Sequence, residues 1–99
     1  MTDKELLENA AKAMGYKYMS SALWDGRDVV EYEWHPQNDD GQALRLAVKL
    51  KLLVNVTDFF TAATNGHEGL DEMLHGNDPY AATRRAIVRA AAEIGKNVS

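Results

Sequence analysis

The strongest constraint on this chain is the regular stretch NDPYAATRRAIVRAAAEIGK at 77–96. Asp78 is a helix-capping residue, and Pro79 suits the first helical position, where a missing N–H costs nothing. Apolar side chains then recur at the helical period on one face, at Tyr80, Ile87, Ala91 and Ile94. The pattern predicts a helix over 79–96 that covers a small core.

A similar pattern opens the chain. Thr2 and Glu5 have the spacing of a capping box, in which each side chain binds a backbone N–H at the helix start. Apolar residues from Leu6 to Met14 share one side of the wheel, and Gly15 suits the left-handed residue that ends a helix. These residues predict a helix over 3–14.

A third helix is predicted over 40–51, with Asn38 or Asp39 as its cap. Its apolar arc covers more than half of the circumference. Only Gln42, Arg45 and Lys49 form a clear polar stripe. So broad an apolar surface predicts a helix wedged between a sheet and another helix.

Two hairpins are predicted between these helices. Strand-like runs at 16–24 and 27–34 flank Asp25-Gly26, a pair typical of tight hairpin turns. In the second run Val30, Tyr32 and Trp34 alternate with acidic residues, as in a strand with one buried face. The β-branched and aromatic run at 52–64 precedes Asn65-Gly66, and a return strand is expected within 67–75.

The whole chain, 1–99, therefore reads as a single α+β domain of order α-ββ-α-ββ-α. Three helices are expected to pack with a mainly antiparallel sheet of about four strands. The predicted core comprises Leu7, Met14, Tyr32, Leu46, Leu50, Val54, Val56, Tyr80, Ile87 and Ile94.

Composition narrows the classes of function. The formal net charge of -4 opposes binding to nucleic acid and to anionic membranes, although a local basic patch can override it. The absence of cysteine excludes a thiol nucleophile and a thiolate zinc site. The N-terminal stretch lacks the pattern of a signal peptide, and no run approaches the roughly 20 apolar residues of a membrane helix. A cytoplasmic protein is expected.

The candidate catalytic residues of this chain are histidines, serines and carboxylates. His67 and His75 flank an acidic segment, 68–72, which makes a metal-assisted enzyme conceivable, but no known ligand spacing is present. His35 stands apart from both. Ser20-Ser21 falls in an expected strand without a nucleophile motif, and Asp39-Asp40-Gly41 is interpreted as helix-cap chemistry. We therefore predict no enzyme, no metal and no cofactor.

Two charged surfaces remain as candidate interaction sites. One is the basic stripe of Arg85, Arg89 and Lys96, which could contact phosphates but is interrupted by Glu93. The other is the acidic first hairpin, whose aromatic tip would favour an interface if exposed. Its residues are Trp24, Asp25, Asp28, Glu31 and Glu33.

Arg84 is the one charged side chain that falls on the apolar side of the last helix. An unpaired charge there would be costly, so the arginine should either reach solvent or meet a carboxylate. We predict an ion pair with Asp39, Asp40 or Asp58.

Two segments, DDGQALRLAVKL at 39–50 and NDPYAATRRAIVRAAAEIGK at 77–96, together resemble small proteins of bacteriophages and prophages. That family is described by its α/β/α layers as a phage ABA sandwich. Trp34 and Pro36 fit the pattern, whereas His35 stands where a smaller polar residue is expected. The resemblance covers about a third of the chain and implies a phage accessory protein in the host cytoplasm, with no catalytic residues to transfer.

The leading hypothesis is thus a non-enzymatic phage protein that binds a host or phage protein. The alternatives are weak nucleic-acid binding through Arg85, Arg89 and Lys96, and a metal-assisted enzyme around His67 and His75.

Overall fold

The computed structural model describes residues 2–56, 60–64, 71–74, 76 and 78–98, of which 60–62 and 71–74 are described by their backbone alone. Within these residues the fold is α+β, as predicted. The helices are α1 (Asp3–Ala13), α2 (Asp40–Lys49) and α3 (Pro79–Lys96). The strands are β1 (Lys17–Met19), β2 (Ala22–Trp24), β3 (Val29–Glu31), β4 (Leu53–Val56), β5 (Phe60–Thr64) and β6 (Asp71–Leu74). The radius of gyration, 12.6 Å, is close to the value of about 13 Å expected for one compact domain of this length.

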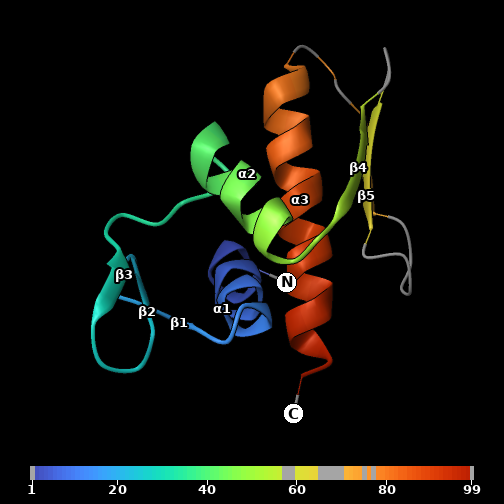
Figure 1. Ribbon diagram of the computed structural model, residues 1–99. Helices are drawn as coiled ribbons and strands as arrows, with labels where there is room; N and C mark the ends of the chain where they lie inside the picture. The colour runs from blue at the N-terminus through green and yellow to red at the C-terminus, as the bar shows by residue number, and fades with distance from the viewer. Residues whose placement is uncertain (1, 57–59, 65–70, 75, 77, 99) are drawn as a thin grey trace.

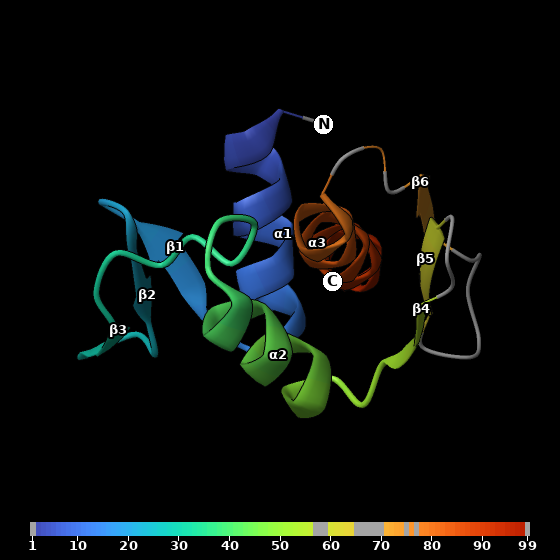
Figure 2. The ribbon, with the colours of Figure 1, turned by 90° about the horizontal axis from the view of Figure 1, so that it is seen from above.

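The described strands form two antiparallel sheets, β1-β2-β3 and β4-β5-β6, rather than the single sheet of about four strands predicted from the sequence. Figures 1 and 2 show the helices between the two sheets, with α1 beside the first and α3 beside the second. The layers therefore run sheet, helices, sheet. This order differs from the helix, sheet, helix order that the resemblance implies.

The composition of α3 explains why the two sheets are kept apart. One side of the helix, with Ile87, Val88 and Ala91, belongs to the main core that α1, α2 and the first sheet share. A neighbouring side, with Ala86 and Ala90, packs on the buried Ala63 of β5. A helix that buries two sides can hold one sheet on each.

The helix ends follow the sequence signals. Thr2 and Glu5 form the capping box, Asp39 caps α2 by accepting from the backbone N–H of Gln42, and Asp78 caps α3. Gly15, with a φ of 82°, follows the last turn of α1 in the left-handed conformation. The predicted helix bounds are confirmed to within two residues, because capping is a local interaction.

The first sheet corrects one predicted strand and one predicted turn. The run 16–24 is divided by a tight turn at Ser20-Ser21, where both residues have positive φ, 52° and 60°. Two such residues are typical of a type I′ turn, which favours asparagine and glycine, so a serine pair gave no signal. The Asp25-Gly26 hairpin exists, but its loop spans 25–28 and only Gly26 has positive φ.

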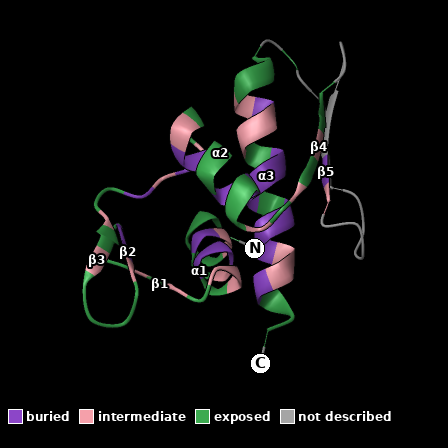
Figure 3. Ribbon diagram, in the orientation of Figure 1, coloured by how far each residue is buried: buried purple, intermediate pink, exposed green. Residues whose placement is uncertain are grey.

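The main core centres on Leu46 and on the contact between α1 and α3. Leu46 is almost completely buried, and small residues such as Ala10, Ala11 and Ala91 let the two helices approach closely. Gly95 lies directly against the backbone of Asn9, at a point where even a Cβ atom would collide. Burial along the chain is shown in Figure 3.

The predicted core is only partly confirmed. Leu7, Leu46 and Ile87 are buried, and Met14, Leu50, Val54 and Ile94 are half-buried. The prediction is wrong for three residues: Tyr32 is 76% exposed, Tyr80 69% and Val56 54%.

Separate structural causes lie behind these three errors. Strand β3 ends at Glu31, so the alternation that would bury Tyr32 stops before reaching it. Val30 of the same run is exposed too, and only Trp34 is buried, where its ring lies 6.1 Å from that of Tyr18. Val56 and Tyr80 flank a groove, described below, that no described element covers.

Gln42 was predicted on the polar stripe of the second helix but is buried. Its Nε2 donates to the carbonyl oxygen of Glu33 at 3.1 Å, and its Oε1 accepts from the backbone N–H of His35 at 2.6 Å. The side chain thus satisfies backbone groups of Glu33 and His35, which makes its burial favourable. Only Arg45 and Lys49 of the predicted stripe are exposed.

The second sheet confirms the expected return strand as β6. The run 52–64, predicted as one strand, instead contains two antiparallel strands, β4 and β5. The Asn65-Gly66 turn lies outside the described residues. The register pairs Leu53 with Thr64 and Val54 with Ala63, and it places β5 at the centre of the sheet. Strand β4 is consequently an edge strand, next to the link from α2.

Candidate functional site: an apolar groove between helices α2 and α3 and strand β4

An apolar groove opens between α2, α3 and β4, and its volume is about 590 Å³. Figure 1 looks toward this side of the molecule, with α3 between α2 and β4. Apolar side chains dominate its lining, including Ala43, Leu44 and Ala47 of α2, Val54 and Val56 of β4, and Tyr80 and Ile87 of α3. We call these residues the α2–α3–β4 groove. Such a concave apolar surface is typical of a binding site.

The groove exists because α2 is covered on one side only. Its buried residues, Gln42, Ala43, Leu46 and Ala47, face the core. The predicted wedging between a sheet and a helix is therefore wrong: Leu44 is 62% exposed, and Val48 on the next turn is exposed as well. The second sheet packs on α3 and not on α2, so the outer face of α2 stays open.

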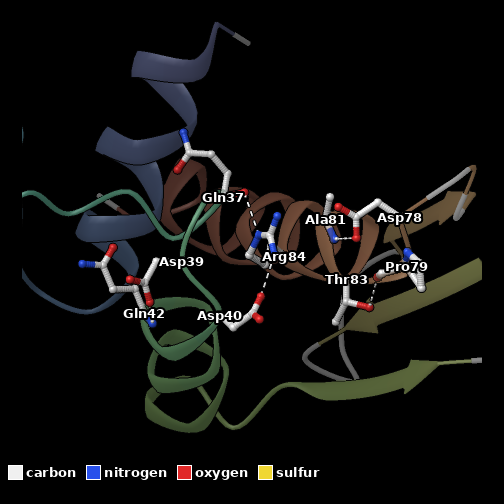
Figure 4. A network of polar contacts seen from close by, with 9 residues as sticks. All are labelled: Gln37, Asp39, Asp40, Gln42, Asp78, Pro79, Ala81, Thr83 and Arg84. Atoms are coloured by element: carbon white, nitrogen blue, oxygen red, sulfur yellow. Dashed lines mark hydrogen bonds and ion pairs between the residues drawn. The ribbon is translucent and has the colours of Figure 1, made fainter.

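Arg84 borders the groove, and Figure 4 shows its polar contacts with Gln37 and Asp40. Its Nη1 lies 2.6 Å from Oδ1 of Asp40, and its Nε donates to the carbonyl oxygen of Gln37 at 2.9 Å. The predicted pairing with Asp40 is thereby confirmed. The side chain of Arg84 is 17% exposed and that of Asp40 65%, so the pair joins α3 to the start of α2 at the rim of the groove.

The predicted basic stripe lines a second, polar groove of about 690 Å³ between α1, α3 and residues 37–38. Arg85, Arg89 and Lys96 are exposed there and come together as predicted. Asp3 and Glu93 line the same groove, so two carboxylates offset three cations. The local charge is only weakly positive, which is a poor match to a phosphate backbone.

The acidic hairpin is less available than its sequence indicated. The side chain of Trp24 is half-buried, and its Nε1 donates to the carbonyl oxygen of Met19 at 3.0 Å, so it is not an exposed anchor. Glu31 forms an ion pair of 2.5 Å with Arg45. Asp28 and Glu33 are exposed.

Asp25 is exposed too but has a structural role in the hairpin loop. Its carboxylate accepts from the backbone N–H groups of Asp28 and Arg27, each at 2.9 Å. Because these hydrogen bonds favour the charged form, they lower the pKa of the Asp25 carboxyl. The carboxylate therefore closes the loop, which leaves it less free to meet a partner.

Among the described residues, no group of three or more histidine, aspartate or glutamate side chains is arranged so that it could hold a metal ion. Ser20 and Ser21 are exposed in a turn. Nδ1 of the half-buried His35 has no hydrogen-bond partner among the described residues. His67 and His75 lie outside the described residues.

Three groove residues are exposed although the sequence predicts them to be buried. The apolar pattern predicts Tyr80 and Val56 in the core and Leu44 on a buried helix face. A period of 3.6 or 2 cannot distinguish a covered face from an open one. The broad apolar arc of 40–51 was the available signal, since an arc wider than the core requires leaves apolar residues on the surface.

No family model, curated protein or solved structure matches this chain. None of the helices in the described residues is long and apolar enough to cross a membrane.

Proposed function

We propose that this protein is a non-enzymatic interaction module that binds a host or phage protein through the α2–α3–β4 groove. One observation carries the proposal: Leu44, Val56 and Tyr80, each more than half exposed, converge on a single concave apolar surface. Burial of apolar surface is the main favourable term in protein association. The resemblance to phage proteins supports the cytoplasm of an infected bacterium as the setting of this proposed activity.

The proposal is tested by capture from a lysate of infected bacterial cells, with and without nuclease. Leu44→Asp and Tyr80→Asp place a charge in the groove without disturbing buried residues, and an acidic residue in the first turn of α3 is favourable to that helix. Met19→Asp is the control, because Met19 is similarly exposed but lies on β1, away from the groove.

The parent chain and Met19→Asp should capture the same protein despite nuclease. Both groove variants should lose it, while their circular dichroism melting curves stay close to that of the parent. Equal capture by all four proteins would contradict the use of this groove.

Nucleic-acid binding is the second candidate, favoured by the convergence of Arg85, Arg89 and Lys96 on one groove. It ranks below protein binding because Asp3 and Glu93 share that groove and the chain has a net charge of -4. Capture that disappears with nuclease would support this alternative.

A further inference from the structure

Strand β4 ends its sheet, since the order is β4-β5-β6. In an antiparallel strand, alternate residues direct their N–H and C=O groups away from the neighbouring strand. Hydrogen bonds among the described residues join β4 to β5 alone, so the outer edge of β4 offers unpaired backbone groups.

The side chains of β4 lack the features that normally protect an edge strand. The sequence Leu-Val-Asn-Val from Leu53 to Val56 contains no charge and no proline, and Leu53 is 67% exposed. Folded proteins usually place lysine, proline or a bulge at such an edge, because a plain apolar edge pairs readily with another strand. Strand β4 is thus open to pairing both through its backbone and through its side chains.

The open edge and the groove adjoin each other. Neighbouring strands lie about 4.8 Å apart, so a strand added beyond β4 would lie over the groove, between β4 and α2. Alternate side chains of that strand would point toward α3. Ala43 and Ala47 leave room there, with Ile87 at the base of the groove. Backbone pairing combined with pockets for alternate side chains is the basis of peptide recognition by strand addition.

The charges near the groove indicate which kind of segment could bind there. Asp40 and Asp78 are exposed at the start of α2 and of α3, and the guanidinium of Arg84 is already bonded to Asp40. A second copy of this chain would bring its own net charge of -4 against these carboxylates, which opposes self-association. A segment with a basic end meets them favourably.

We infer that the groove takes an extended peptide segment of another protein, with apolar side chains at alternate positions and a basic residue at its end. The segment adds as a strand to the free edge of β4 and fills the groove with alternate side chains. This inference rests on the proposed function, which it deepens by naming the class of ligand.

The test uses the full chain and a fluorescein-labelled synthetic peptide with three valines alternating with threonines between terminal lysines, followed by fluorescence anisotropy. Two further peptides carry N-methyl groups on one or the other alternate set of amides. Only the amides that face β4 donate hydrogen bonds in strand pairing. Methylation of that set should weaken binding at least about tenfold, and methylation of the set that faces away should weaken it less than about threefold. Glutamates in place of the terminal lysines should weaken binding at least about tenfold.

Leu44→Asp should abolish binding of the lysine-ended peptide, and Met19→Asp should leave it unchanged. Equal affinity of the two N-methylated peptides, or no binding of the unmodified peptide, would overturn strand addition. A dimer of the chain that the peptide dissociates would show that a second copy is the occupant and would also overturn the inference. If the peptide fails to bind but the parent chain still captures a protein from the lysate and the groove variants do not, only strand addition is overturned and the proposed function stands. Failure of this inference and failure of the proposed function are therefore distinguishable.

Discussion

At the scale of single residues, Arg84 shows how a sequence anomaly identifies a tertiary contact. An arginine on the apolar face of a helix is expected to pair with a carboxylate. Asp40, 44 positions earlier in the chain, provides that carboxylate. The bond to the carbonyl oxygen of Gln37 was not predictable, since no pattern marks a backbone acceptor in a loop. Arg85, the next residue, is exposed in the polar groove and provides a matched comparison.

Arg84→Met should lower the free energy of unfolding by about 1–2 kcal/mol, a modest value because Asp40 is largely exposed and its side of the pair is screened. Arg85→Met should change it by less than about 0.5 kcal/mol. Thermal unfolding measures both, with about 4–8 °C expected for each kcal/mol in a domain of this size. Equal shifts for the two variants would show that the Arg84 contacts do not stabilise the fold.

At the scale of elements, the contact between α1 and α3 depends on Gly95. A Cβ atom there would lie 1.7 Å from the carbonyl oxygen of Asn9, a backbone atom that can move only if the helices separate. Helix propensity alone would favour alanine by up to about 1 kcal/mol. The packing cost should exceed this gain in helix propensity, since α1 and α3 share the most extensive helix–helix contact among the described residues.

Gly95→Ala should therefore reduce the free energy of unfolding by about 2–3 kcal/mol, measured by urea denaturation. Gly41→Ala is the control in α2. Its Cβ would lie 3.3 Å from side-chain atoms of Arg45 and Asp39, and the exposed arginine can move. This control should be neutral or gain up to about 1 kcal/mol. A Gly95→Ala variant as stable as the parent would mean that the helices pack less closely than described here.

At the scale of the whole molecule, electrostatics weighs against nucleic acid. The chain carries a net charge of -4, and the polar groove that Arg85, Arg89 and Lys96 line also includes Asp3 and Glu93. No measurable binding to duplex DNA is expected at physiological salt, as measured by anisotropy of a labelled duplex.

If Arg85, Arg89 and Lys96 do contact phosphates, a plot of log affinity against log salt should have a slope of about -2.7, from about 0.9 per contact. The triple change to glutamate should then abolish binding without altering the melting temperature. Salt-dependent binding with these properties would reverse the ranking of the two candidate functions.

The sequence alone determined the features that depend on interactions between residues close in the chain. These are the three helices with their caps, the first hairpin and the α+β class. The caps at Thr2, Asp39 and Asp78 and the left-handed Gly15 depend on atoms within four residues, so a reader of the sequence can find them. The need of Arg84 for a partner was also visible, because the cost of an unpaired charge on an apolar face does not depend on the fold.

The tertiary structure alone decided which apolar faces are covered. Tyr80 and Ile87 lie on the same predicted face of α3, yet one is exposed and the other buried. The second sheet packs on Ala86 and Ala90 instead of closing over α2, and that choice leaves Leu44, Val56 and Tyr80 around an open groove. The spacing of apolar residues shows that a face is apolar, whereas the burial of that face depends on which distant element packs against it. For that reason the candidate binding site emerged only from the arrangement of α2, α3 and β4.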